Sequence, residues 1–145
     1  MRISTKGTYA VQLMIYLARH ENEDPIALKE VCKETGISKK YLEQIGFTLA
    51  TAKLVRSVRG ASGGYKLARN AKDITMLDIL MATEGTLTPV EYMDELSGEV
   101  TDGQTHYEVF VWRKLHKIIK EYLGSVTLQD IVDKSYELEI DSYSI

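Results

Sequence analysis

The hydrophobic and polar positions of the first 35 residues follow the period of amphipathic α-helices. The first helix is expected to begin at Ser4 or Thr5, because either hydroxyl can cap free backbone N–H groups. Five apolar positions then recur at steps of three and four: Ala10, Leu13, Met14, Leu17 and Ala18. Residues 22–25 break this helix, and a short second helix is expected over residues 27–35, with Gly36 as its C-terminal cap.

A third helix is expected after Ser38, which is a favourable N-cap residue. Its apolar face holds three aliphatic residues: Leu42, Ile45 and Leu49. Its other face displays polar and aromatic side chains: Lys40, Glu43, Gln44 and Phe47. Two helices joined by a short glycine-containing turn are typical of a helix-turn-helix, whose second helix reads DNA.

Two β-strands are predicted next, over residues 54–59 and 64–68, with a glycine-rich hairpin tip at residues 60–64 between them. A strand pair that follows a helix-turn-helix is a wing. This wing carries four cations: Arg56, Arg59, Lys66 and Arg69. Such side chains can reach a phosphate backbone or a minor groove.

The pattern changes after residue 70. Thr75 and Asp78 have the spacing of a capping box, which predicts a helix to about residue 83. Residues 85–89 read as a loop, and residues 91–106 as an acidic, glycine-containing segment that we expect to be mobile. A second capping-box spacing, from residue 127 to 130, predicts a short last helix, and residues 137–145 are expected to fray.

A long helix is predicted from about residue 107 to 123, with a broad apolar stripe. The stripe consists of Phe110, Trp112, Leu115, Ile119 and Tyr122, widened by Val111 and Ile118. We interpret Trp112, Leu115, Ile119 and Tyr122 as a homodimer interface. The alternative is that the stripe packs onto the head of the same chain, by which we mean residues 1–70. The predicted fold is mainly α with a small β wing. Residues 1–70 would form a winged helix-turn-helix DNA-binding domain, and residues 71–145 a linker helix, acidic loop and dimerisation helix.

The charge distribution separates the same two halves. Residues 1–70 hold 12 Lys+Arg and 6 Asp+Glu (12 − 6 = +6), whereas residues 71–145 hold 6 and 15 (6 − 15 = −9). A basic head on an acidic body suits a nucleic-acid binder, although a merely uneven surface gives the same totals. The chain has no apolar run of the roughly 18 residues that a membrane span needs and no signal-peptide pattern, and its one cysteine has no disulfide partner within the chain. We therefore expect a cytoplasmic protein that does not contact a membrane.

Several short blocks stand out in order along the chain: residues 1–7 (MRISTKG), 36–38 (GIS), 41–44 (YLEQ), 54–60 (LVRSVRG) and 63–65 (GGY). Together they resemble the Rrf2 family of winged-helix transcription regulators. The resemblance implies a homodimer whose second motif helix enters the major groove of double-stranded DNA while the wing touches the minor groove. If the DNA contacts of the family are transferred to this sequence, the contacting residues are Arg2, Ser4, Lys6, Ser38, Lys40, Tyr41, Glu43, Gln44, Arg59, Gly60, Ser62 and Lys66.

The chemistry of several of these residues agrees with the resemblance. Gln44 can pair bidentately with adenine, Glu43 can accept from a cytosine amino group, and Arg59 suits a narrow, electronegative groove. Tyr41 could instead be half-buried packing. Glu43 could instead pair with Lys39 or Lys40.

Two features depart from the family. Residues 46–52 lack the cations that many relatives carry there, and Gly46 weakens a helix by up to about 1 kcal/mol relative to alanine. Cluster-binding relatives place three cysteines in the loop before the long helix, but here Tyr92 stands at the first such position and the loop through His106 contains no cysteine. Because iron–sulfur clusters need several thiolates, we predict no cluster, no other cofactor and no metal site.

Cys32 is interpreted as a small buried or half-buried thiol, and a redox switch favoured by Lys29 and Lys33 is the alternative. No nucleophile and base stand at a credible spacing, so an enzyme is not expected. The function predicted is a sequence-specific regulator, a repressor, that binds a pseudo-palindromic operator as a homodimer. The alternatives are a thiol-redox sensor or a small-ligand sensor, the latter with a pocket walled by Met76, Leu80, Tyr92 and Phe110, and a protein-binding adaptor that uses the Trp112 helix. The sequence does not identify an effector or partner protein.

Overall fold

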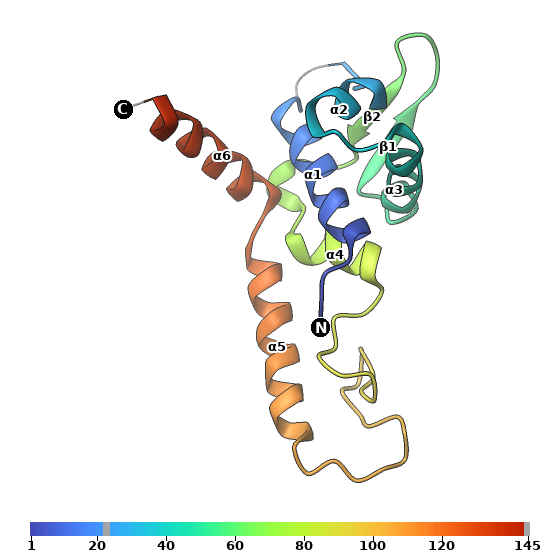
Figure 1. The fold of residues 1–145 in the computed structure, drawn as a ribbon, viewed down its shortest axis with the longest axis vertical. Coiled ribbons are helices and arrows are strands. Elements are labelled where there is room, and N and C mark those ends of the chain that lie inside the picture. Colours follow the sequence, from blue (N-terminus) through green and yellow to red (C-terminus); the bar gives the residue numbers. More distant parts are fainter. Residues whose placement is uncertain (22–23, 144–145) are drawn as a thin grey trace.

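Helices precede and follow a small antiparallel sheet in the computed structural model, which describes residues 1–21 and 24–143 (Figure 1). The elements are α1 (Thr5–Arg19), α2 (Leu28–Thr35), α3 (Lys39–Thr51), β1 (Val55–Val58), β2 (Gly64–Leu67), the 3-10 helix η1 (Ala71–Asp73), α4 (Met76–Glu84), α5 (Val109–Ser125) and α6 (Leu128–Tyr143). The predicted break at residues 22–25 and the predicted tail at residues 137–145 lie partly outside the described residues. Each predicted helix and strand is present, with ends that differ by one or two residues except in α6.

Side chains at the predicted positions cap the helices. Ser4 accepts the Gly7 N–H at 3.0 Å at the start of α1, and Ser38 accepts the Tyr41 N–H at 3.2 Å at the start of α3. Thr75 begins α4 with a complete capping box, in which its hydroxyl and the Asp78 carboxylate each accept a backbone N–H. These bonds satisfy N–H groups that lack partners within the helix, so they fix where each helix starts.

A single hydrophobic core spans both halves of the chain. The apolar faces predicted for α1 and α3 meet in this core, where Leu13, Leu42 and Leu49 have no exposed surface. Leu128 and Val132 of α6 belong to the same cluster, and α6 packs against α1. The predicted boundary at residue 70 is therefore no break in the core, and the division into two domains remains a proposal about function.

The last helix is longer than predicted. It has 16 residues and reaches Tyr143, so the predictions of a short helix and of a frayed tail from residue 137 are wrong. The reason lies in contacts with α1, because Arg19 forms an ion pair with Glu139 and stacks over the Tyr136 ring at 5.0 Å. These contacts tie Tyr136 and Glu139 of α6 to the end of α1, which no local pattern in the tail could indicate.

The acidic segment before α5 is held by backbone hydrogen bonds, and the expected mobile loop is not what the structure shows. Met93 and Val100 form an antiparallel bridge, flanked by a bond from the Thr101 N–H to the Tyr92 carbonyl at 2.8 Å. Asp94 accepts the N–H groups of two residues in the turn that follows: Leu96 and Ser97. The segment and α5 extend away from the head in the same direction (Figure 1).

Candidate nucleic-acid interface

The helix α3 presents one face to the core and the opposite face to solvent. Leu42, Ile45 and Leu49 are fully buried, which rotates the helix so that the other side of each turn faces outward. The exposed stripe contains four residues at positions i, i+3, i+4 and i+7: Lys40, Glu43, Gln44 and Phe47. Recognition helices place base-contacting side chains at this spacing, over two turns.

A shallow groove of about 500 Å³ runs between α3 and the start of α1. It is lined by Lys6, Lys40, Glu43, Gln44, Phe47 and Thr48. The groove therefore brings together the predicted contacts at residue 6 and on α3, which lie more than thirty residues apart in sequence. The two lysines give it positive charge, and Gln44 gives it both a donor and an acceptor.

The alternatives for Tyr41 and Glu43 are resolved differently. The Tyr41 ring is half-buried and meets the Tyr9 ring edge to face, with centroids 5.4 Å apart, so packing is part of its role. Glu43 is exposed and, among the described residues, forms no ion pair with Lys39 or Lys40. The Glu43 carboxylate is therefore available for an external donor.

Ser4 has a second partner that the sequence did not indicate. Its backbone N–H donates to Glu84 Oε1 at 2.7 Å and its hydroxyl donates to Glu84 Oε2 at 2.8 Å. Because the hydroxyl has a single proton, this bond competes with the phosphate contact predicted for Ser4. It also joins the end of α4 to the start of α1. The neighbouring Arg2 is exposed and Lys6 is half-buried.

The wing is a two-stranded hairpin with a basic outer end. The cations Arg56 and Lys66 are cross-strand partners, and the hairpin closes through a bond from the Gly63 N–H to the Gly60 carbonyl at 3.0 Å. Arg59, Gly60 and Ser62 at the tip are all exposed. The predicted minor-groove contacts therefore occupy one continuous turn of the chain.

Tyr65 fixes the wing to the helix-turn-helix, and sequence reasoning missed this role. Its N–H donates to the Ile26 carbonyl at 2.8 Å, and the Ile26 N–H donates to the Tyr65 carbonyl at 2.9 Å. Its ring lies on Gly46 of α3, where a Cβ atom would come within 2.8 Å of Tyr65 Cζ. The lack of a side chain at Gly46 therefore leaves room for the Tyr65 ring. The motif at residues 63–65 was the sequence feature that could have indicated this contact.

The outer side of α5 carries an apolar stripe that the rest of the chain leaves exposed. Four side chains spaced along one side of this helix are between 40% and 65% exposed: Val111, Leu115, Ile118 and Tyr122. Trp112 and Ile119, which were predicted to share the interface with Leu115 and Tyr122, are half-buried. The alternative in which the stripe packs on the chain's own head is not what the structure shows.

Comparison with known proteins identifies the family. The model of the Rrf2 family, described as an iron-dependent transcriptional regulator, matches residues 3–134. The chain belongs to the Rrf2 family. The transcriptional regulator CymR of Bacillus subtilis is 37% identical over 131 residues, which are 90% of this chain and 89% of CymR.

Solved structures of Rrf2 proteins have the same fold. The structure of B. subtilis CymR, described as the global cysteine regulator of that organism, has a TM-score of 0.78 at 36% identity and covers 92% of this chain and 98% of its own. The structure of T. potens IscR has a TM-score of 0.75 at 38% identity and covers 95% and 90%. The predicted fold class, family and function class are confirmed: the chain is a helix-turn-helix transcriptional regulator and not an enzyme.

The residues before α5 do not fit the iron–sulfur cluster that an iron-dependent Rrf2 regulator suggests. Tyr92 stacks on His106 with centroids 3.6 Å apart, and His106 Nε2 lies 2.8 Å from Asp102 Oδ2. The Tyr92 hydroxyl donates to Glu108 at 2.5 Å, and this bond lowers the pKa of the Glu108 carboxyl below its usual value. Within the described residues no three His, Cys, Asp or Glu side chains converge on a metal position, and the chain's single cysteine lies on α2.

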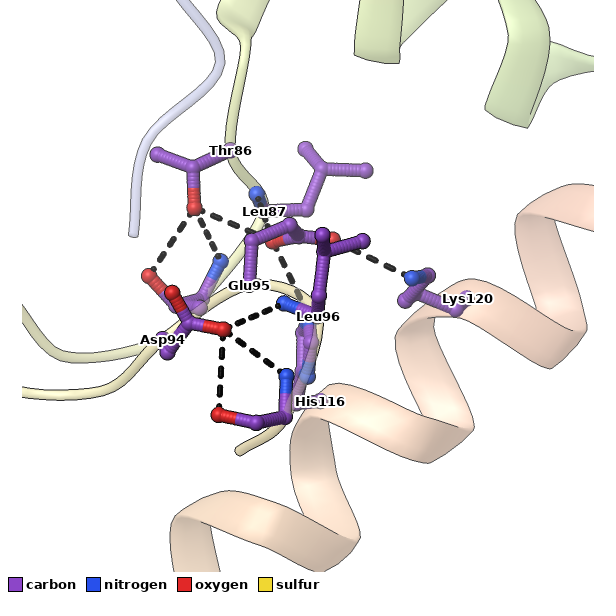
Figure 2. Close-up of polar contacts among 9 residues, drawn as sticks. Thr86, Leu87, Asp94, Glu95, Leu96, His116 and Lys120 are labelled. Atoms are coloured by element: carbon purple, nitrogen blue, oxygen red, sulfur yellow. Dashed lines mark hydrogen bonds and ion pairs between the residues drawn. The ribbon is translucent and has the colours of Figure 1, made fainter. Parts of the chain in front are cut away.

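This segment is held against α5 by a polar cluster in which His116 is buried and Glu95 and Lys120 are half-buried (Figure 2). Glu95 Oε2 accepts the Leu87 N–H at 2.9 Å and the Thr86 hydroxyl at 3.0 Å, and lies 3.1 Å from His116 Nε2. The Lys120 ammonium lies 3.2 Å from Glu95 Oε1. Burial by itself raises the pKa of Glu95, but these hydrogen bonds outweigh it and lower the pKa below the ordinary value.

The suggested redox cysteine and the residues of the suggested ligand pocket lie in different parts of the molecule. Cys32 is half-buried and packs against the core, as its first interpretation required. Met76 packs against the core from α4, whereas Phe110 of the suggested ligand pocket is 70% exposed on α5. No helix in the described part of the chain is long and apolar enough to span a membrane.

Proposed function

We propose that this Rrf2 protein is a repressor that binds a pseudo-palindromic operator in double-stranded DNA as a homodimer, without an iron–sulfur cluster. The observation that carries the proposal is the groove between α1 and α3, in which lysines flank the exposed Glu43 and Gln44. In the major groove, Gln44 would pair with adenine and Glu43 would accept from cytosine. The remaining contacts to this groove come from Ser38, Lys40 and Tyr41.

The wing supplies the second set of contacts. Arg59, with Gly60 and Ser62 at the hairpin tip, would enter the adjacent minor groove, whose negative potential attracts an arginine. Lys66, together with Arg2, Ser4 and Lys6 at the other end of the interface, would contact phosphates. Because the Tyr65 ring packs on Gly46, the wing and α3 would approach the duplex as one unit.

The exposed stripe of α5 supports the homodimer. An apolar face of this length is costly in water, and a second copy of the same helix covers it with complementary residues. Leu115 and Tyr122 lie in the stripe, and Trp112 and Ile119 would contribute from its edge. Two heads carried by such a dimer would reach major grooves separated by one or more helical turns. Bound there, the dimer would exclude RNA polymerase from the DNA, so we expect it to repress transcription. We expect it to act in the cytoplasm.

Selection of bound sequences from a random duplex pool tests the proposal. We expect enrichment of an inverted repeat, and we expect binding to weaken with rising salt. Arg59→Ala should weaken binding to the selected operator, and Gln44→Ala should reduce discrimination by about 1–3 kcal/mol at one base pair. Lys134→Ala, which removes an exposed cation of α6, is the matched control and should change neither. A pool that never enriches would contradict the proposal.

A further inference from the structure

Phe47 is the feature of α3 that the contacts above leave unexplained. Its side chain is 74% exposed, the highest value among the large hydrophobic residues of the described part of residues 1–70. The other aromatic residues on the helix-turn-helix, such as Tyr9 and Tyr41, are half-buried against the core. The exposed phenyl ring is therefore accessible to an apolar group of a bound molecule, and burying it there would be favourable.

The position of Phe47 along α3 indicates what the ring meets. It lies one turn beyond Glu43 and Gln44 on the same exposed stripe and lines the same groove. Lys6 and Lys40 also line this groove, and the positive charge matches a phosphate backbone rather than an apolar protein surface. With α3 in a major groove, a ring at this position would face the edges of base pairs.

The chemistry of the second half of α3 points the same way. Residues 46–52 contain no lysine or arginine, so this part of the helix offers few contacts to phosphate. A phenyl ring has no hydrogen-bonding group and cannot distinguish bases by donor and acceptor pattern. The one apolar group that a base pair presents in the major groove is the 5-methyl group of thymine.

We propose that Phe47 contacts the 5-methyl group of a thymine and thereby sets a thymine preference at one position in each half of the operator. This inference rests on the proposed function, because it requires α3 to lie in the major groove. It assigns to an apolar residue the specificity that many recognition helices obtain from hydrogen bonds. The absence of cations from residues 46–52 is consistent with a hydrophobic contact at this part of the helix.

Replacing thymine with uracil in the duplex tests this contact, because uracil lacks only the methyl group. The wild-type operator is first selected from a random pool, and each thymine is then replaced singly with deoxyuridine. At one thymine per half-site, we expect wild-type affinity to fall about fourfold, the equivalent of one buried methyl group. In Phe47→Ala the affinity for the thymine operator should fall, and the difference between thymine and uracil at this position should disappear.

Two controls separate the outcomes. Gln44→Ala should keep the uracil penalty while losing discrimination at its own base pair, and Phe47→Leu should keep part of the penalty. The melting temperature of Phe47→Ala should match that of the wild type, because the ring is mostly exposed. If the wild type selects an operator but Phe47→Ala keeps every uracil penalty, this inference is overturned and the proposed function stands. If the wild type selects no operator, the proposed function itself fails.

Discussion

Replacing Gly64 with alanine should detach the wing from the helix-turn-helix. A Cβ atom at Gly64 would lie 2.2 Å from the Ile26 carbonyl oxygen and 2.7 Å from the Ala27 nitrogen. Both are backbone atoms, so no side-chain rotation relieves the contact. The adjacent pair of hydrogen bonds between Ile26 and Tyr65, at 2.8 and 2.9 Å, would have to separate.

The cost follows from the bonds that are lost. Each backbone hydrogen bond contributes a net of about 1 kcal/mol, and a buried group left unpaired adds roughly 1–3 kcal/mol. Ile26 is 5% exposed, so water does not easily replace its partner. We therefore expect Gly64→Ala to lower the free energy of unfolding by about 2–4 kcal/mol.

Urea denaturation at a fixed protomer concentration measures this effect, because the stability of the proposed dimer would depend on concentration. Gly124→Ala in α5 is the matched control, since its Cβ atom would meet only Leu77 Cδ2 at an ordinary 3.5 Å. This control should be neutral or stabilising by up to about 1 kcal/mol. A loss below about 0.5 kcal/mol for Gly64→Ala would refute the argument from close approach.

Further predictions concern the segment before α5 and the α5 helix itself. The lowered pKa of Glu95 means that its stabilisation is present above its ordinary value of 4.5 and is lost as the pH falls through the lower folded value. Glu95→Gln should therefore melt below the wild type at pH 7, and the difference should shrink in acid; a constant difference would rule out the linkage. Ile118→Asp should place a charge in the α5 stripe and raise the dimer dissociation constant roughly a hundredfold in analytical ultracentrifugation. Lys117→Asp, whose side chain is exposed outside the stripe, should leave the dissociation constant nearly unchanged, and equal behaviour of the two variants would argue against this dimer surface.

Short sequence patterns predicted where helices begin, because the capping hydrogen bonds that start a helix form between residues close in sequence. Ser4, Ser38 and Thr75 each act within three residues of themselves, so the starts of α1, α3 and α4 could be identified from spacing. The length of α6 could not, since it depends on Arg19, 120 residues away from Glu139. The acidic segment was misjudged for a similar reason: Glu95 is fixed by His116 and Lys120, which lie on α5.

The candidate site was only partly predictable. Exposure of Lys40, Glu43 and Gln44 followed from the helical period, because burying Leu42 and Ile45 turns them outward. The groove with Lys6, the bond between Ser4 and Glu84 and the packing of Tyr65 all require the tertiary fold. The local sequence therefore determines which side chains of α3 point outward. It does not determine how α3 is placed relative to α1 and the wing.

Gly46 shows most clearly why this distinction affects function. By propensity alone it weakens α3, and from the sequence it was read as a defect in the recognition helix. In the fold it is buried under the tip of the Tyr65 ring, so a side chain there would force that ring to move away from α3. The same tyrosine pairs with Ile26 through its backbone, which requires Gly64 beside it. Two glycines eighteen residues apart thus allow one aromatic ring to hold the wing at a set position relative to α3, and the helix gives up propensity in exchange for that geometry.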